Sequence, residues 1–194
     1  MSISSVKDSS LKEYFKIIFL GDPKVGKTSL IRRILNLDLL LEYSPTIGLR
    51  YHNLDVQQNE IQYYLQIWDV SGNEIYSELI LPLLKGVSVV VLVFDYKDTK
   101  SQIDLPNLYS KVLEKVPPSQ ILLVGNKYEN IKKEIPKVLA PWIKEHNLKI
   151  YPVSAKEDKG KSLLLKKIIQ ILENIPDNRK SKSIEVRIGI HESK

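Results

Sequence analysis

A glycine- and lysine-rich stretch directly follows an apolar run near the start of the chain. Its letters, GDPKVGKT over residues 21–28, match the spacing G-x-x-x-x-G-K-[ST] without a mismatch. Glycines let consecutive backbone N–H groups point at phosphate oxygens, and a following helix adds the partial positive charge of its N-terminus. Lys27 can reach the β- and γ-phosphates of a nucleotide, and the Thr28 hydroxyl can bind Mg²⁺. The predicted phosphate-binding residues of this loop are Gly21, Asp22, Pro23, Lys24, Val25, Gly26, Lys27, Thr28 and Ser29.

Two further segments carry residues suited to a triphosphate and its metal ion. Asp69 stands at the end of an apolar run, where a carboxylate can hold Mg²⁺ through water. Gly72 can offer its N–H to a γ-phosphate without steric obstruction, and loss of that phosphate would let the segment relax. Thr46 lies in the loop after the first helix and can contact Mg²⁺ and the γ-phosphate from the opposite side. We therefore predict that Thr28, Thr46 and Asp69 bind the metal ion and that Thr46 and Gly72 contact the γ-phosphate.

Two polar segments later in the chain follow the last two apolar runs. Asn126-Lys127-Tyr128-Glu129 ends the fifth run, and Ser154-Ala155-Lys156 ends the sixth. Both should lie at the carboxyl edge of the sheet, where ligands bind in such folds. A carboxylate there can accept from a base that presents two N–H donors, an edge that guanine has and adenine lacks. The sequence therefore favours a guanine nucleotide.

Apolar runs alternate with amphipathic stretches along most of the chain. We expect strands over residues 15–20, 47–56, 61–69, 87–95, 120–125 and 149–153. We expect helices over residues 27–38, 74–85, 104–116, 136–147 and 161–174. This alternation predicts an α/β fold with right-handed crossovers and a mainly parallel sheet. The second and third runs are too close for a crossover, so they should form an antiparallel hairpin at one edge of the sheet.

Prolines and a possible capping residue indicate several helix boundaries. Asp104 with Pro106 is typical of a helix start, and Pro136 suits the first turn of the following helix. The pair Pro117-Pro118 should end one helix and precede the next strand.

The chain divides into one domain with a short segment on either side. We assign residues 1–12 to a flexible lead, residues 13–176 to the domain and residues 177–194 to a tail. Within the tail, residues 184–190 alternate like a strand. They would form an extra edge strand, become ordered on a partner or remain a flexible tail.

The composition of the 194 residues narrows the function classes. Without any cysteine, the chain has no disulfides, thiol catalysis, cysteine-bound zinc or cysteine-linked lipid. The first residues lack a signal-peptide pattern and Ser2 excludes N-myristoylation, so we expect a cytoplasmic protein, at most peripheral at membranes. The net charge is +6, but the lysines are scattered and many lie beside glutamates, so we do not expect a nucleic-acid partner.

From about Phe15 to Pro176 the motifs resemble, in order, those of a small Ras-superfamily GTPase, with Rab-like letters in SPTIG and WDVSGNE. The resemblance covers roughly five-sixths of the chain. It implies a three-layer G domain with a six-stranded sheet, helices on both faces, GTP and GDP as ligands, Mg²⁺ as cofactor and two switch loops. It also implies a set of guanine contacts. Asn126 and Lys127 would hold the ring, Glu129 its N1 and N2 donors and Ala155 its O6, with Ser154 and Lys156 in support.

The resemblance also gives catalytic roles to Lys27, Thr46, Gly72 and Asn73, and here the sequence departs from the family. Asn73 stands where the family usually has a glutamine that orients the attacking water, and its side chain is one methylene shorter. Pro23 replaces a usual glycine and removes a backbone donor, while Lys24 adds a cation nearby. We expect slow GTP hydrolysis. The alternative is a nucleotide-dependent scaffold that does not hydrolyse GTP.

Two departures concern the base. Glu129 replaces the family's usual aspartate and is longer by one CH₂, so either its loop shifts or guanine affinity drops. Leu39 lies where the family commonly has an aromatic residue over the guanine face. It would either speed nucleotide exchange, or pack with Leu40 and Leu41 on the core or at a switch surface.

Protein partners are expected at the two switch loops. Effectors, an exchange factor and an activating protein should bind through residues 39–48 and 70–84. The apolar residues of the predicted effector face are Leu49, Ile75, Leu79 and Ile80. The tail lacks the cysteines that carry prenyl groups in many relatives, so its basic residues would give at most weak contact with anionic lipid.

Overall fold

The computed structural model describes residues 14–40, 42, 44–58, 61–73, 80–129 and 134–175. Six strands form one sheet in the order β2-β3-β1-β4-β5-β6. The strands are β1 (Tyr14–Leu20), β2 (Leu49–Gln58), β3 (Ile61–Val70), β4 (Val89–Asp95), β5 (Ile121–Asn126) and β6 (Ile150–Pro152). The helices are α1 (Lys27–Ile34), α2 (Ile80–Leu83), α3 (Thr99–Leu113), α4 (Ala140–Glu145) and α5 (Lys161–Glu173), with a 3₁₀ turn at Pro118–Gln120.

The pairing confirms a mostly parallel sheet with one antiparallel edge strand. β1 pairs in parallel with β3 and β4, β4 with β5, and β5 with β6. β2 pairs antiparallel with β3 from Leu49 opposite Val70 to Gln58 opposite Ile61, as the short connection between them predicted. The chain order reverses on either side of β1, and ligands of such sheets bind beyond the carboxyl ends of the strands at this point.

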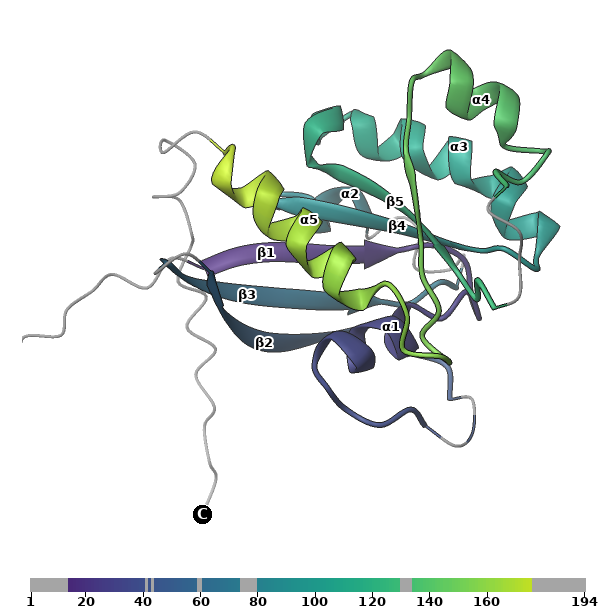
Figure 1. Ribbon diagram of the computed structural model, residues 1–194. Coiled ribbons are helices and arrows are strands. Elements are labelled where there is room, and N and C mark those ends of the chain that lie inside the picture. The colour runs from purple at the N-terminus through teal and green to yellow at the C-terminus, as the bar shows by residue number, and fades with distance from the viewer. Residues whose placement is uncertain are drawn as a thin grey trace, which may run out of the picture.

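Helices cover both faces of the sheet, so the domain has three layers (Figure 1). Helices α1 and α5 pack on one face, where Phe15, Ile17 and Phe19 of β1 point. Helices α3 and α4 cover the other face, against Ile18 and Leu20. β4 is buried along its whole length because it lies between two strands and under both helix layers.

Helix α1 ends at Ile34, whereas the sequence predicted a helix to residue 38. Asn36 has a φ of 56°, in the left-handed region that asparagine tolerates better than most residues. The Leu37 N–H then donates to the Arg32 carbonyl at 2.8 Å, which closes the helix end.

Helix α3 begins at Thr99, so the predicted start at Asp104 is wrong. Asp98 caps the helix because its carboxylate accepts from the backbone N–H groups of Lys100 and Ser101. Pro106 consequently lies inside the helix rather than in its first turn.

The fourth predicted helix is also shorter than expected. The carbonyl of Pro136 accepts from the N–H groups of Leu139 and Ala140, and the helix itself starts only at Ala140. Pro141, not Pro136, stands in its first turn. The predicted lead, the tail with its strand-like residues 184–190, and residues 74–79 of the predicted switch segment 70–84 lie outside the described residues.

Candidate functional site

The loop between β1 and α1 has a backbone that two glycines make possible. Gly21 has a φ of 146° and Gly26 a φ of 93°. A Cβ atom on Gly21 would lie 2.1 Å from the Val93 carbonyl oxygen, and one on Gly26 would lie 2.4 Å from Nδ2 of Asn126. Lys24 adopts a left-handed φ of 65° without being glycine. The predicted phosphate loop is therefore tightly seated between β4, β5 and α1.

Lys27 is buried at the start of α1, and its ammonium points back across this loop. Nζ donates to the carbonyl oxygens of Gly21 and Asp22 at 2.8 and 2.9 Å. Burial lowers the pKa of Lys27 to about 8, against the opposing charges of Asp69 and Asp22. A cation that loses its hydration on burial gains free energy when an anion binds beside it, so Lys27 is suited to bind a phosphate.

Three oxygen-bearing side chains from separate segments meet beside Lys27. The Thr28 hydroxyl donates to Oδ2 of Asp69 at 2.6 Å and lies 3.1 Å from the Thr46 hydroxyl, which is itself 3.4 Å from the same carboxylate oxygen. Asp69 is fully buried, and its Oδ1 has no hydrogen-bond partner among the described residues. The structure thus brings all three predicted metal-binding residues together.

This set of oxygens suits Mg²⁺, which prefers hard oxygen ligands and usually keeps several waters. The unpartnered Oδ1 of Asp69 fits a hydrogen bond to such a metal-bound water. In the part of the chain that the structure describes, no three His, Cys, Asp or Glu residues gather closely enough to hold a metal ion alone.

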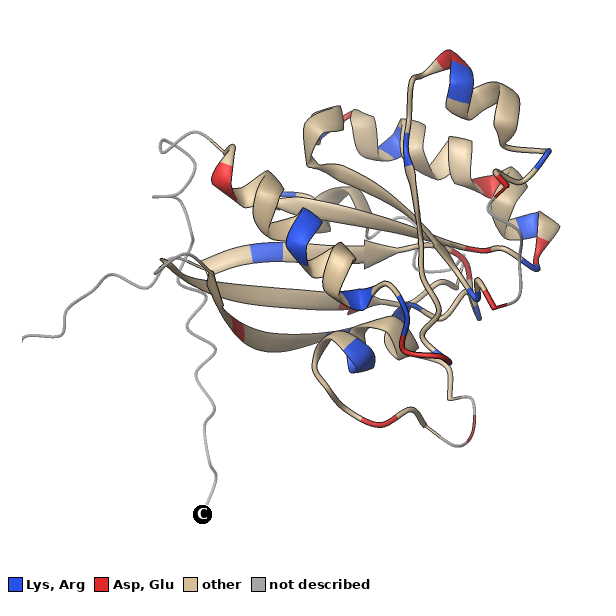
Figure 2. Cartoon of the chain, in the orientation of Figure 1, with Lys and Arg blue, Asp and Glu red and all other residues tan. Residues whose placement is uncertain are grey.

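A cavity of about 600 Å³ opens above these groups. Its described lining includes four cationic residues and one acidic residue, a balance that favours a polyanion. Figure 2 shows red and blue segments gathered in loops at the carboxyl end of the sheet, whereas most of the strand length is tan. The lining residues are Pro23, Lys24, Gly26, Lys27, Thr28, Ser29, Arg32, Leu40, Glu42, Ser44, Pro45, Thr46, Ile47, Ser71, Gly72, Asn73 and Lys127.

Gly72 lies directly against the phosphate loop. A Cβ atom on Gly72 would come within 2.4 Å of the Asp22 carbonyl carbon and the Pro23 nitrogen, so a glycine is required for this close approach. The next residue, Asn73, is exposed at the cavity rim, and its backbone N–H donates to the Ser71 hydroxyl at 3.2 Å. Leu40, rather than Leu39, lines the cavity.

The predicted base-binding residues form a second group, which is tied to the phosphate loop through Asn126. The buried Asn126 amide donates to the Val25 carbonyl at 2.9 Å, and its Oδ1 accepts the N–H of Ala155 at 3.1 Å. The N–H predicted for guanine O6 is therefore paired within the protein. Lys127 has a left-handed φ of 60°, and its Nζ lies 2.7 Å from Oδ2 of Asp95.

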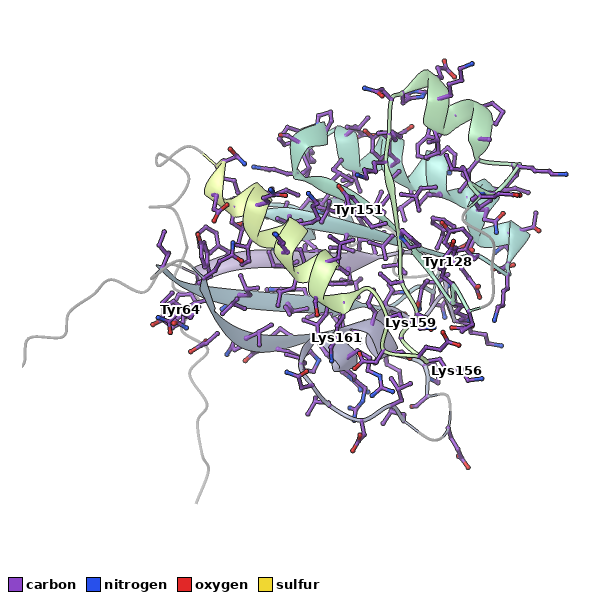
Figure 3. All side chains as sticks on the ribbon, in the orientation of Figure 1. Tyr64, Tyr128, Tyr151, Lys156, Lys159 and Lys161 are labelled. Carbon is purple, nitrogen blue, oxygen red and sulfur yellow. The ribbon has the colours of Figure 1, made fainter. Side chains whose placement is uncertain are left out.

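Glu129 also makes its contacts within this group. Its Oε1 accepts from the Ser154 hydroxyl at 2.6 Å and its Oε2 lies 2.5 Å from Nζ of Lys97. Figure 3 shows Lys156 and Tyr128 at this carboxyl end of the sheet, and Tyr64 at the opposite end. Of the six predicted guanine-binding residues, all of them described, Lys127 alone lines the 600 Å³ cavity.

Sequence reasoning missed four residues that hold the site together. Arg32 lines the cavity and donates to the Asp38 carbonyl at 2.5 Å, while Arg33 donates to the Ala155 carbonyl at 2.9 Å. Both follow Thr28 by about one helical turn, which was the available signal. Asp95 is the last residue of the buried strand β4 and Lys97 follows two residues later, so both reach the same sheet edge as the predicted motifs.

The fold and the site together define a nucleotide-binding α/β protein with a phosphate loop at the switch point of its sheet. The family model described as "Ras family" matches residues 16–174. The chain therefore belongs to the Ras family and is a Rab-like small GTPase of that superfamily.

Curated relatives agree with this assignment. The chain is 33% identical over 153 residues to the Ras-related protein RABG3b of Arabidopsis thaliana, covering 74% of this chain and 75% of the relative. It is 32% identical over 157 residues to the Ras-related protein Rab-7a of Paramecium octaurelia, with 77% and 76% covered. It is 28% identical over 180 residues to the human Ras-related protein Rab-7b, with 88% and 90% covered.

None of the helices in the described ranges combines the length and the apolar character needed to cross a lipid bilayer.

Proposed function

We propose that this chain is a molecular switch that binds GTP and GDP with Mg²⁺ in the 600 Å³ cavity and hydrolyses GTP slowly. One observation carries the proposal. The oxygens of Thr28, Thr46 and Asp69 lie within 3.4 Å of one another, beside the buried ammonium of Lys27. Thr46 comes from the loop before β2, and Asp69 stands near the end of β3, just before the loop of Gly72. A γ-phosphate would hold both loops in place, which is the arrangement a nucleotide-dependent switch needs.

The phosphate end supports both binding and catalysis. In the proposed complex, Lys27 exchanges its two carbonyl partners for phosphate oxygens and neutralises charge that develops on the transferred phosphoryl group. The Gly72 N–H, already next to the phosphate loop, donates to the γ-phosphate. Mg²⁺, held by Thr28 and Thr46 with Asp69 acting through water, supplies further charge neutralisation when it is bound.

The base end supports guanine. The Glu129 carboxylate would accept from the N1 and N2 donors of guanine, while Asn126 and Lys127 hold the ring and Ser154 and Lys156 support the loop. The N–H of Ala155 would contact guanine O6 after it leaves Oδ1 of Asn126.

Slow hydrolysis follows from the residues next to the γ-phosphate position. Asn73 lies at the cavity rim. Its side chain is one methylene shorter than the glutamine that orients the attacking water in the family, so its amide does not reach as far. Pro23 lines the same cavity and has no N–H to donate to a phosphate oxygen. An activating protein that supplies a water-positioning group would raise the rate.

Effectors and regulators should bind the switch loops together with the exposed part of the β2–β3 hairpin. Leu49 and Tyr51 are 38% and 54% exposed, and the Tyr51 ring lies 6.3 Å from that of Trp68. Ile80, the first residue of α2, is partly buried against the core, whereas the predicted effector residues Ile75 and Leu79 lie outside the described residues. An apolar strip beside a nucleotide-sensing loop is suited to a state-dependent partner.

The test is to release the nucleotide that co-purifies with the protein, identify it by chromatography, and follow GTP turnover with Mg²⁺ present. We expect guanine nucleotide in about equimolar amount and single-turnover phosphate release slower than that of relatives that carry the glutamine. Absence of guanine nucleotide uptake at millimolar concentration would disprove the proposal.

The second candidate is a nucleotide-dependent scaffold that binds GTP without hydrolysing it. The favouring observation is that Pro23 and Asn73 both line the cavity at the γ-phosphate end. Phosphate release in multiple turnovers, with and without cell extract, separates the two candidates. A switch is accelerated by a component of the extract, and a scaffold shows no release in either condition.

A further inference from the structure

The candidate guanine-reading carboxylate is held by a lysine that belongs to none of the sequence motifs. Nζ of Lys97 lies 2.5 Å from Oε2 of Glu129, and the Ser154 hydroxyl donates to Oε1 at 2.6 Å. The two oxygens therefore have separate donors on opposite sides of the carboxylate. The Lys97 side chain is 53% exposed, whereas that of Glu129 is only 10% exposed.

The position of Lys97 is fixed by the end of β4. Its backbone N–H donates to Oδ1 of Asp95 at 2.8 Å, and Oδ2 of the same carboxylate lies 2.7 Å from Nζ of Lys127. Asp95 pairs in register with Asn126 of β5. One buried carboxylate thus positions the turn that carries Lys97 and the loop that carries Lys127 and Glu129.

Such a holder matters because glutamate has one more rotatable bond than aspartate. An unrestrained Glu129 would lose rotamer freedom on binding a base, which lowers the affinity for that base. Contacts from Lys97 and Ser154 remove that freedom before any base arrives. Each carboxylate oxygen can accept two hydrogen bonds, so both oxygens keep a lone pair for an incoming N–H donor.

The charge state of Glu129 agrees with this arrangement. Burial alone would raise the pKa of Glu129, but hydrogen bonds from Lys97 and Ser154 and the charges of Lys97 and Lys156 lower it below its usual range. The carboxylate therefore stays ionised at neutral pH and acts only as an acceptor, as the N1–H and N2–H groups of guanine require.

We propose that Lys97 is a positioning residue for base selectivity, holding the extended carboxylate of Glu129 where it accepts from the 2-amino group of guanine. This inference rests on the proposed guanine-nucleotide function. Lys97 explains how Glu129 can replace the family's shorter aspartate, because its ion pair keeps the longer side chain in one position. Because the Lys97 side chain is itself about half exposed, its ion pair should contribute little to folding, and the effect of Lys97 is on selectivity.

The test compares GDP with IDP, whose hypoxanthine base keeps N1–H and lacks the 2-amino group. In Lys97→Met, GDP affinity should fall about three- to tenfold, since a charge-assisted contact that orients the acceptor is lost. IDP affinity should change little, so the GDP-to-IDP affinity ratio drops about threefold or more. Lys97→Glu, which repels Glu129, should lower the ratio further, and Lys97→Arg should restore it.

Lys159→Met is the matched control. Lys159 forms an exposed ion pair of 2.6 Å with Glu157 in the neighbouring loop, and Figure 3 marks its position. This variant should leave the GDP-to-IDP ratio unchanged. Thermal unfolding of the nucleotide-free proteins should be the same for wild type, Lys97→Met and Lys159→Met.

The outcomes separate the inference from the proposed function. If wild type takes up no guanine nucleotide, the function itself is wrong. If wild type binds GDP but the ratio is unchanged or rises in Lys97→Met, only the role of Lys97 is overturned. An equal loss for GDP and IDP would likewise reject selectivity and leave a merely structural contact.

Discussion

The phosphate end and the base end of the candidate site are built in different ways. At the phosphate end, backbone groups and short side chains from Gly21 to Thr28 meet Thr46 and Asp69 around a cavity. At the base end, longer side chains are paired with one another, as in Lys97 with Glu129 and Lys127 with Asp95. At the phosphate end, a larger residue would collide with the backbone, so few substitutions should be tolerated. At the base end, a change to one side-chain pair should leave the loop backbone in place.

The largest expected effect is at the phosphate end, in Lys27→Met. The variant keeps the apolar stem but loses the ammonium, so GDP affinity should fall roughly 10²–10³-fold, or about 3–4 kcal/mol. Titration calorimetry with GDP and Mg²⁺ measures the loss. Lys24→Met, which removes an exposed cation from the same cavity, is the control and should lose less than about tenfold. Similar losses in both variants would mean that general positive charge, not the buried ammonium, binds the phosphates.

Gly72→Ala should have the next largest effect, confined to the triphosphate state. The new Cβ would collide with backbone atoms of Asp22 and Pro23 at 2.4 Å, so the segment must move off the phosphate loop. Single-turnover GTP hydrolysis should slow about 10–100-fold because displaced groups no longer position the reaction. GDP affinity should change less than about threefold, since GDP has no γ-phosphate. An equal loss of GDP binding would show that Gly72 supports the whole loop.

Asn73→Gln restores the longer amide at the cavity rim and should raise the hydrolysis rate by about tenfold. The same change should leave GDP affinity and the GDP-to-IDP ratio unaltered, because Asn73 lies at the opposite end of the site from Glu129. Phosphate release from a single turnover is the measurement. If the rate does not rise, Pro23 is the stronger block, and Pro23→Gly in the Asn73→Gln background should then raise it.

The sequence predicted the phosphate end more completely than the base end, for a physical reason. Gly21 and Gly26 are required by backbone conformation and close contacts, so their spacing already encodes the loop. The pairing of Lys97 with Glu129 depends on how two loops from different strands sit side by side. No local sequence pattern predicts such a contact, so Lys97 could not be distinguished from the other lysines of the chain.

The fold shows the same division between local and distant determinants. The mainly parallel sheet and its antiparallel hairpin were predicted from the alternation of apolar and amphipathic segments and from the short connection before Ile61. The start of α3 was misplaced because Pro106 resembles a first-turn proline. The helix in fact begins at Thr99, five residues earlier than predicted, where the Asp98 carboxylate accepts from two backbone N–H groups of the first turn. A proline inside a helix and a cap before it can be distinguished only when the hydrogen bonds are seen.

The smallest predicted effect is the change of GDP affinity with pH. It tests whether a bound phosphate offsets the cost of burying the charged Lys27 ammonium. In the free protein its pKa is about 8, so the protonated fraction falls from about nine-tenths at pH 7 to about one-quarter at pH 8.5. A bound phosphate raises this pKa again, so GDP affinity should fall about fourfold over that interval.

The corresponding proton uptake is the direct measurement. Titrations at pH 8 in buffers of different ionisation enthalpy should reveal about half a proton taken up with each GDP, because half of the free Lys27 is neutral there. The stability of the free protein should change with pH in the direction opposite to GDP affinity, since an unfolded lysine binds its proton up to about pH 10.5. This one group therefore makes the fold more stable as the pH rises from about 8 towards 10.5. Binding that is independent of the buffer at pH 8 would mean that the ammonium is fully charged before phosphate arrives. In that case its two carbonyl contacts already offset its burial, and the phosphate end would resemble the base end in having its charges paired in advance.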